Sequence, residues 1–167
     1  MENLEIERKW IFNDSEKSKS FLNVNLHLKK LVNLEIGYTK DDIRVSHFKS
    51  FDVKNKKEKI FYRINTKKSI NGTLVRQEDK CDITENVYKS IFEKTLGRRI
   101  IKKRFIYELD SLILEIDEFE YCKIPNLKLI EVEFSSEKEA NNFKPSYPIF
   151  GIEVTNDFRF LNINLAF

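Results

Sequence analysis

The sequence has few of the residues that mark linkers, repeats or disulfide scaffolds. Its 167 residues include four glycines, three prolines and two cysteines. The glycines and prolines occur singly, so no flexible linker divides the chain, and no internal repeat is present. The length and the even distribution predict a single domain over residues 1–167.

Both cysteines lie outside any metal-binding or redox motif. Isolated residues such as Cys81 and Cys122 are typical of free, buried thiols in a reducing compartment. The N-terminal residues lack the apolar stretch of a signal peptide, and no apolar run approaches the ~18 residues of a membrane span. These absences predict a cytoplasmic protein with no membrane as partner.

Neither sign of charge dominates the composition. Thirty Lys and Arg residues face 27 Asp and Glu residues, which leaves a formal charge of +3. A general nucleic-acid binder needs a larger cationic surplus, so nucleic acid is not expected as a partner. The charged fraction of 34% accompanies many Phe, Ile and Leu residues, which is the composition of a folded chain.

Alternation of apolar and polar residues with period two predicts a chain made mostly of β-strands. The strand-like segments are 4–12, 35–48, 59–68, 73–80, 100–109, 112–119, 127–134 and 150–155. Many strands with few helices predict an antiparallel β-barrel, α+β by content, with helices packed outside.

Three short helices are expected between the strands. Their capping residues are Asp14 or Ser15 for the first, Thr84 for the second, and Ser136 with Glu139 for the third. In the second helix Val87, Ile91 and Thr95 would form one stripe, and Gly97 would stop the helix.

The charged residues of the strands are sorted by sign. Successive side chains alternate between faces, so residues two apart share a face. Three strands each present two carboxylates in this way: Glu5 and Glu7, Glu115 and Asp117, and Glu131 and Glu133. Basic residues share a face on other strands: Lys102 with Arg104, and Arg76 with Lys80, on a face that also carries Glu78.

Two interpretations of these charged faces are open. They could be the solvent side of a β-sandwich, since antiparallel sheets commonly face water on one side. A solvated face usually mixes its charges, however, and like charges two residues apart repel unless an opposite charge lies between them. A divalent cation would balance the carboxylates and a polyanion the bases, so a metal-bound oligophosphate would satisfy both.

The charged strands also form an ordered series of motifs. The first is the ExExK pattern Glu5-Ile6-Glu7-Arg8-Lys9. It is followed by Gly37-Tyr38, Ile43-Arg44-Val45, Val75-Arg76-Gln77-Glu78, Lys102-Lys103-Arg104-Phe105, Leu114-Glu115-Ile116-Asp117, Ile130-Glu131-Val132-Glu133 and a tail from Glu153 through Ala166. Over nearly the whole chain, this series resembles the CYTH superfamily, the triphosphate tunnel metalloenzymes.

The resemblance implies an eight-stranded antiparallel barrel that forms a tunnel, with charged side chains inside and a few helices outside. It implies a divalent-metal-dependent triphosphatase, a phosphoanhydride hydrolase that uses Mg²⁺ or Mn²⁺ to convert inorganic triphosphate to pyrophosphate and phosphate. The expected partner is therefore a small-molecule triphosphate, and the assembly state, including a homodimer, is open.

The resemblance also implies roles for individual residues. Metal ligands would be drawn from Glu5, Glu7, Glu78, Glu115, Asp117, Glu131 and Glu133. Phosphate contacts would come from Arg44, Lys67, Arg76, Lys102 and Arg104. Lys9 and Tyr38 would orient and activate water; a lysine base needs a lowered pKa, which nearby arginines would favour.

Two positions depart from the family's pattern. Ser46 stands where a second arginine is usual, and Lys80 stands where a second carboxylate after Glu78 is usual. Lys80 lies either outside the tunnel, on a strand that ends early, or inside it. The lysine-rich stretch before residue 63 is interpreted as a long loop, and either Lys67 or Lys68 faces the tunnel.

Other functions fit the same motifs. A class IV adenylate cyclase or a nucleoside or thiamine triphosphatase would use a similar tunnel, with a pocket for the organic group that the sequence does not locate. A non-catalytic module that binds nucleotide or polyphosphate is the alternative outside enzymes.

Overall fold

The computed structural model describes residues 4–109 and 111–167. The strands are β1 (Leu4–Phe12), β2 (His27–Tyr38), β3 (Arg44–Asp52), β4 (Lys57–Asn71), β5 (Val75–Ile83), β6 (Arg99–Leu109), β7 (Leu112–Tyr121), β8 (Lys128–Glu133) and β9 (Phe150–Glu153). The helices are α1 (Glu16–Asn25), α2 (Glu85–Phe92), α3 (Glu137–Asn142) and α4 (Asn162–Leu165), with 3₁₀ turns η1 (Glu93–Thr95) and η2 (Phe158–Phe160).

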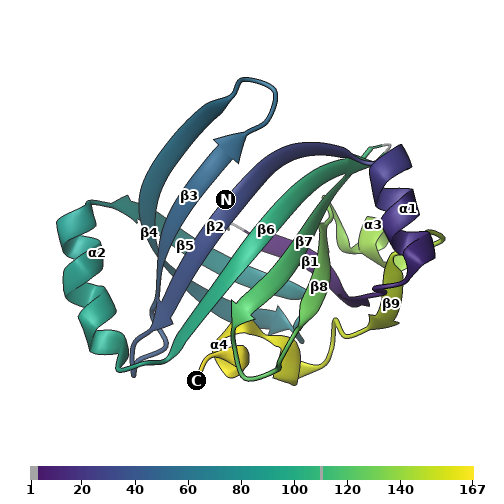
Figure 1. Cartoon of the computed structure of the whole chain (residues 1–167). Helices are drawn as coiled ribbons and strands as arrows, with labels where there is room; N and C mark the ends of the chain where they lie inside the picture. Colours follow the sequence, from purple (N-terminus) through teal and green to yellow (C-terminus); the bar gives the residue numbers. More distant parts are fainter. Residues whose placement is uncertain (1–3, 110) are drawn as a thin grey trace.

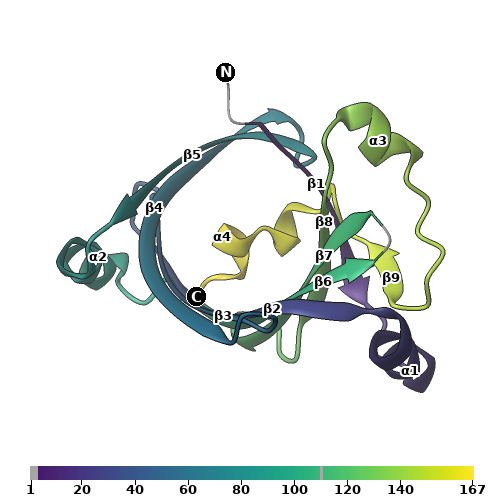
Figure 2. The same cartoon turned by 90° about the horizontal axis from the view of Figure 1, so that it is seen from above.

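Eight strands close into an antiparallel barrel, as the resemblance implies (Figures 1 and 2). The order around the barrel is β1-β5-β4-β3-β2-β6-β7-β8, and β8 pairs again with β1. Strand β1 divides one of its edges between two partners, because its first residues pair with β5 and its last residues pair with β9. Closure leaves the barrel strands without a long free edge.

The segment 35–48 forms two strands, so its prediction as one strand is wrong. Strands β2 and β3 pair from Lys30↔Asp52 to Tyr38↔Arg44 around a turn in which Asp42 has a φ of 61°. The interpretation of the lysine-rich stretch as a loop is also wrong, because β3 and β4 continue as a paired hairpin to Asp52↔Lys57. This hairpin projects beyond the rest of the barrel wall (Figure 1).

The three expected helix starts are confirmed. The side chains of Ser15, Thr84 and Ser136 accept hydrogen bonds from the backbone N–H groups of Ser18, Val87 and Glu139. Such caps satisfy backbone donors that have no partner within the helix. The second helix continues through η1 to its C-cap Leu96, and Gly97, with a φ of 87°, follows as the expected stop.

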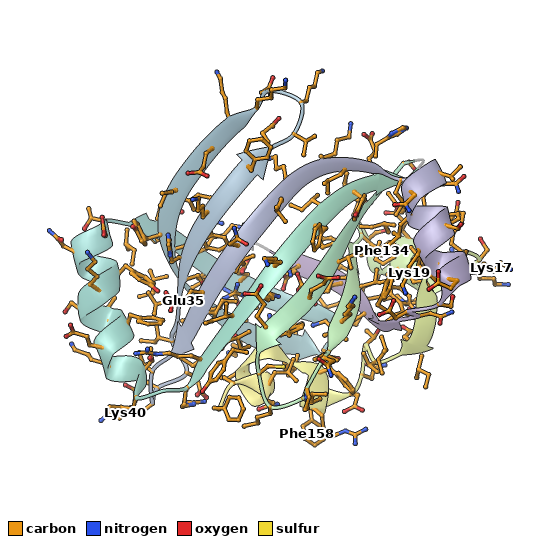
Figure 3. All side chains as sticks on the ribbon, viewed as in Figure 1. Lys17, Lys19, Glu35, Lys40, Phe134 and Phe158 are labelled. Carbon is orange, nitrogen blue, oxygen red and sulfur yellow. The ribbon has the colours of Figure 1, made fainter. Side chains whose placement is uncertain are left out.

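Helix α2 packs on the outer surface of the barrel against β3 and β4. Its buried residue is Tyr88, whose hydroxyl donates to Glu35 Oε2 at 3.0 Å. Glu35, labelled in Figure 3, lies on β2. Val87 is exposed, so the expected stripe is wrong at that residue. The stripe that packs begins one residue later, at Tyr88.

Two apolar clusters lie on opposite sides of the barrel wall. The outer cluster includes Trp10 and Ile116 and is covered by α1, α3 and β9 (Figure 1). The inner cluster includes Ile100 and Leu129 and packs around Leu165 of α4, which lies within the ring of strands in Figure 2. The barrel interior is therefore apolar at one end, and its charged residues are confined to the rest.

Two smaller observations bear on the expectations from composition. Both cysteines are free, but Cys81 is exposed, so the prediction of two buried thiols is wrong for that residue. In the described part of the chain, no helix combines the length and the hydrophobicity that crossing a bilayer requires.

A close contact between Gly37 and η1 gives a test of the outer packing. A Cβ at Gly37 would lie 2.6 Å from Thr95 Cγ2, so Gly37→Ala should overpack the site by about 1–3 kcal/mol. The melting temperature should fall by a few degrees, at about 2–4 °C per kcal/mol for a chain of this size. Thermal denaturation measures this change.

Thr95→Ser provides the matched control. It removes Cγ2 but keeps the hydroxyl that donates to Phe92 O at 2.7 Å. The double variant should recover part of the loss caused by Gly37→Ala. If single and double variants melt equally far below the wild type, this contact does not limit the packing.

Candidate active site

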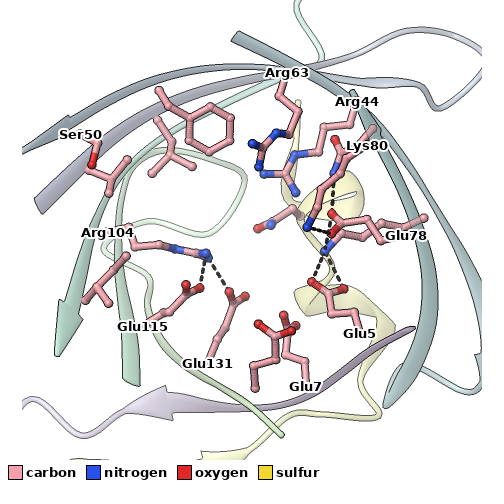
Figure 4. A pocket seen from close by; sticks show the side chains of 18 of the residues that line it. Glu5, Glu7, Arg44, Ser50, Arg63, Glu78, Lys80, Arg104, Glu115 and Glu131 are labelled. Atoms are coloured by element: carbon pink, nitrogen blue, oxygen red, sulfur yellow. Dashed lines mark hydrogen bonds and ion pairs between the residues drawn. The ribbon is translucent and has the colours of Figure 1, made fainter. Parts of the chain in front are cut away.

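Two adjoining cavities lie inside the barrel. Their volumes are about 440 Å³ and 450 Å³, within the ~300–1,000 Å³ typical of ligand sites. Five residues line both cavities and so mark their junction: Arg44, Asn65, Lys67, Arg76 and Asn162. The first cavity, shown in Figure 4, also contains most of the carboxylates predicted from the sequence.

Strands β1, β7 and β8 build an acidic wall of the first cavity. Their register places Glu7 opposite Glu133, and Glu115 opposite Glu131. Glu5 precedes Glu7 on the same face of β1, and all five line the cavity. The two-residue spacing in the sequence thus becomes one continuous acidic surface, because the three strands are neighbours.

Glu133 is the carboxylate of this wall whose charge is least compensated. Partial burial raises its pKa, and the charges of Glu5 and Glu7 raise it further. No basic side chain within residues 4–109 and 111–167 forms a salt bridge with it. Repulsion among three carboxylates identifies a position where a cation would be stabilised.

The donor set around Glu133 fits a divalent metal ion. Glu5, Glu7 and Glu133 offer carboxylate oxygens, the hard ligands that Mg²⁺ and Mn²⁺ prefer. Within the described residues, no three acidic, histidine or cysteine side chains already stand in a metal-binding arrangement. Glu5 and Glu7 are instead paired with basic side chains: Glu5 with Lys67 and Arg76, and Glu7 with Arg76 and Lys9.

Strands β3, β4 and β5 build the basic wall. Arg76 Nη2 lies 3.0 Å from Glu5 Oε2 and 3.2 Å from Glu7 Oε1, and Lys67 Nζ lies 2.7 Å from Glu5 Oε1. Arg44 makes no salt bridge with any described residue; its Nε donates to Ser46 Oγ at 3.1 Å. Among the described residues that line the cavity, Glu133 is thus left without a basic partner, and Arg44, together with the exposed Lys30 and Lys59, without an acidic one.

The two family departures have clear positions. Strand β5 continues to Ile83, so the alternative in which the strand ends before Lys80 is wrong, and Lys80 lines the first cavity. Its Nζ lies 3.2 Å from Glu78 Oε2. Ser46 is buried and supports Arg44 instead of adding a second cation. Lys67 faces the cavity, whereas Lys68 is exposed.

Glu78 is occupied by its neighbours on β4 and β5. It accepts a hydrogen bond from Asn65 Nδ2 at 2.8 Å and lies 3.6 Å from Lys67 Nζ. Burial opposes its charge, but Lys67 and Asn65 outweigh burial and lower the pKa of Glu78 to about 2. In this state Glu78 orders the basic wall.

Lys102 and Asp117 lie beneath the cavity and not in it. Both are fully buried and form a salt bridge, and Asp117 also accepts hydrogen bonds from Arg104 Nε at 2.6 Å and Nη2 at 2.7 Å. Neither residue lines either cavity. Their charges neutralise each other under the site, and the expected roles of Lys102 as a phosphate contact and of Asp117 as a metal ligand stay predictions.

Arg104 reaches the cavity but is held on three sides. It forms a salt bridge with Asp117 and, as Figure 4 shows, with Glu115 and Glu131. Burial disfavours its charge, but these carboxylates raise its pKa further above the usual range. The guanidinium thus fixes the two cavity carboxylates Glu115 and Glu131 at their positions.

The two expected catalytic residues both hold their protons firmly. Lys9 Nζ lies 2.7 Å from Glu131 Oε1 and 3.5 Å from Glu7 Oε1. Burial lowers the pKa of Lys9, but the two carboxylates outweigh burial, so the pKa is raised; nearby arginines were expected to lower it. Burial also raises the pKa of Tyr38, which lines the second cavity.

Several cavity residues were not predicted from the sequence. Asn65 lies two residues before Lys67 on the same face of β4, and sorting the faces of that strand would have found it. Asn162 lies in a segment without strand alternation, so no pattern identifies it. An apolar part of the cavity wall, including the stacked rings of Phe48 and Phe61 at 4.5 Å, carries no charge signal.

The geometry defines a class of protein: a closed antiparallel barrel whose interior cavity has facing acidic and basic walls. No protein-family model matches the chain. The curated inorganic triphosphatase of Nitrosomonas europaea is 42% identical over 96 residues, which span 57% of this chain and 62% of that protein.

Solved structures extend the similarity over nearly the whole chain. A crystal structure of the inorganic triphosphatase NE1496 is 30% identical, covers 97% of this chain and 93% of its own, and has a TM-score of 0.57. A second crystal structure, of the hypothetical protein NE1496, is 32% identical with 97% of each chain covered and a TM-score of 0.58.

A more distant structure shares the fold. The PH1819 protein from Pyrococcus horikoshii OT3 is 18% identical, with 82% of each chain covered and a TM-score of 0.56. Together with the motif order and the barrel, the two closer matches establish the family. The chain belongs to the CYTH superfamily, the triphosphate tunnel metalloenzymes.

The positions of Asp117 and Glu133 predict opposite phenotypes for two isosteric variants. Asp117→Asn leaves Lys102 and Arg104 without their shared buried counter-charge and should lower the free energy of unfolding by about 3–5 kcal/mol. Glu133→Gln relieves repulsion from Glu5 and Glu7, so the free energy of unfolding should stay unchanged or rise slightly. Chemical denaturation in the presence of a chelator compares the two. An equal loss for both variants would contradict the assignment.

Proposed function

We propose that this protein hydrolyses inorganic triphosphate to pyrophosphate and phosphate with Mg²⁺ or Mn²⁺. The observation that carries the proposal is the pair of facing walls, in which Glu133 lacks a cation and Arg44 lacks an anion. A metal-bound triphosphate supplies both charges in one ligand. Similarity to an inorganic triphosphatase over 97% of the chain supports the same substrate.

Binding would replace one set of ion pairs by another. Without ligand, Glu5 and Glu7 are balanced by Lys67 and Arg76. Glu5, Glu7 and Glu133 would hold the metal ion, which neutralises negative charge that develops on the phosphoryl group when bound. The bases released from these carboxylates then bind phosphate oxygens, so no buried charge is left without a partner.

The bases would hold the triphosphate across the junction of the cavities. Arg44, Lys67 and Arg76 all line that junction, and Arg guanidinium groups bind phosphate through paired N–H donors. Arg104, Glu115 and Glu131 would keep the opposite wall in place through their mutual salt bridges. Fixed donors aimed at phosphate oxygens stabilise the charge of the transition state.

Lys9 and Tyr38 would act in their protonated forms. The ammonium of Lys9 keeps Glu131 and Glu7 in position and also lies 3.4 Å from Phe160 O. The hydroxyl of Tyr38 would donate a hydrogen bond to a phosphate oxygen or to water in the second cavity. Water would attack the terminal phosphorus, and its proton would leave with the phosphate product.

The proposal predicts metal-dependent release of phosphate from tripolyphosphate. Excess chelator should abolish release, and Mg²⁺ or Mn²⁺ should restore it. Glu133→Gln should raise the metal concentration for half-maximal activity by about tenfold or more, because a carboxylate ligand is lost. Release that persists in chelator would refute the metal assignment, and metal-dependent binding without turnover would favour a non-catalytic binding module.

A second candidate is hydrolysis or cyclisation of an organic triphosphate. The observation in its favour is the apolar wall of the first cavity, where the Phe48 and Phe61 rings stack at 4.5 Å beside Val32, Leu34 and Ile106. Inorganic triphosphate has no apolar surface to bury there, whereas a flat organic group would pack against these rings. ATP and thiamine triphosphate belong in the same assay, and a kcat/KM above that of tripolyphosphate would favour this candidate.

Lys80 provides a test of the charge balance in the cavity. Lys80→Glu should raise KM for tripolyphosphate and lower the metal concentration for half-maximal activity, because a cation near the phosphates becomes an anion near the metal. A unit charge ~8 Å away at an effective dielectric of ~20 contributes about 2 kcal/mol. Lys80 is 48% exposed, so solvent screening should reduce the effect to several-fold.

Lys68→Glu is the matched control. Lys68 is exposed on the other face of β4, so the same change of net charge should alter neither parameter by more than about twofold. Titration of metal and of tripolyphosphate against both variants decides the outcome. Equal curves for the two variants would mean that Lys80 does not act on the bound ligand.

A further inference from the structure

The junction of the two cavities contains polar atoms that lack partners. Four buried side-chain atoms of the described residues have neither a hydrogen bond nor a salt bridge: His47 Nε2, Asn65 Oδ1, Arg76 Nε and Asn162 Oδ1. Asn65, Arg76 and Asn162 line both cavities, so three of the four gather where the cavities meet. Buried polar atoms are rarely left unpaired, and a cluster of them indicates a missing ligand.

Asn162 is distinct among these residues because the barrel strands do not supply it. It is the first residue of α4, and it lies between Leu161 and Ile163, which line the second cavity alone. None of the described residues is hydrogen-bonded to its side chain, whereas Asn65 still donates to Glu78. A polar side chain between two apolar residues, aimed into a cavity, carries an uncompensated cost unless a ligand pairs with it.

The segment that carries Asn162 is fixed to the barrel on both sides. Before it, Val154 N donates to Lys9 O at 2.8 Å, and Lys9 N donates to Thr155 Oγ1 at 3.0 Å. After it, Lys123 N donates to Leu165 O at 2.9 Å, and Leu165 is 1% exposed in the inner apolar cluster. The side chain is thus positioned before any ligand arrives, which lowers the entropy lost on binding.

A carboxamide can pair with a phosphate oxygen. Its N–H₂ group donates two hydrogen bonds, and half a turn of the terminal torsion exchanges the oxygen and the nitrogen. The neighbouring donors at the junction, Arg44 and Arg76, are cations suited to the same ligand. A neutral donor among them adds a directional contact without further charge repulsion.

We infer that the Asn162 carboxamide is a substrate-binding group that donates a hydrogen bond to a phosphate oxygen of the triphosphate, and that it couples the C-terminal segment to the occupied site. The inference rests on the proposed function and adds a residue to it. Since the contact is made by α4, ligand binding stabilises the docking of the segment that fills one end of the barrel (Figure 2).

The test combines kinetics with a binding measurement that needs no turnover. Asn162→Ala should raise KM for tripolyphosphate about tenfold to hundredfold, the range for a lost hydrogen bond to a charged group, with kcat changed much less. Asn162→Asp should raise KM further, because it replaces the donor by an anion. Tripolyphosphate with Mg²⁺ should raise the melting temperature of the wild type more than that of either variant.

Asn164→Ala is the control for a merely structural role. Asn164 lies on the same helix, is exposed, and donates through Nδ2 to Phe158 O at 2.8 Å. Its loss should lower stability without changing KM by more than about twofold. Hydrogen exchange at the Leu165 and Ala166 amides should slow on adding tripolyphosphate in the wild type and in Asn164→Ala, but not in Asn162→Ala.

The outcomes separate the inference from the proposed function. The inference would be overturned if both Asn162 variants kept the wild-type KM and the wild-type stabilisation by ligand. Triphosphate hydrolysis would not be affected by that result. A parallel rise in KM for Asn164→Ala and Asn162→Ala would overturn it as well, since the segment would then act through its fold alone. A wild type that is stabilised by tripolyphosphate but releases no phosphate would refute the proposed function only.

Discussion

Mutual neutralisation of acids and bases across the barrel interior is the interaction on which the rest of the structure depends. A closed barrel with charged side chains inside cannot leave them to bulk water, and unpaired charges in such a space are costly. The chain meets this constraint by placing the acids on β1, β7 and β8 and the bases mainly on β3, β4 and β5. Each wall supplies the counter-charge of the other.

The same arrangement makes the interior receptive to a ligand of mixed charge. Lys67 and Arg76 form salt bridges of ordinary length with carboxylates that line the cavity. Their charges are neutralised, but a ligand in the cavity could replace these partners. By contrast, Asp117 and Lys102 are fully buried and line neither cavity, and Arg104 is the member of this group that reaches the first cavity. The interior therefore has a layer of fully buried ion pairs beneath the ion pairs that line the cavity.

Much of this fold could be predicted from the sequence because it depends on residues that lie close together in the chain. The two-residue spacing of Glu5 and Glu7, and of Glu131 and Glu133, fixes a shared face whatever the rest of the chain does. The caps at Thr84 and Ser136 are equally local. The family resemblance supplied the strand count and the tunnel, which alternation alone does not determine.

Other features depend on distances that no local pattern encodes. Lys102 and Arg104 share a face of β6 but lie at different depths along the barrel. Which of them reaches the cavity depends on the position of the inner apolar cluster and α4. The turn at Asp42, by contrast, has a local signal that the strand assignment passed over, since Thr39-Lys40-Asp41-Asp42 is a run of four polar residues that interrupts the alternation. Asn162 was missed because its position is set by the path of the C-terminal segment.

The divided edge of β1 has a consequence for the order of folding. This first strand needs Val75–Gln77 on β5, Leu129–Glu133 on β8 and Phe150–Glu153 on β9 as partners, all distant in sequence. Such non-local pairing forms slowly, because long loops must close first. Glu5 and Glu7 therefore stay unplaced on a growing chain until β8 has emerged, and the acidic wall of the cavity is completed late.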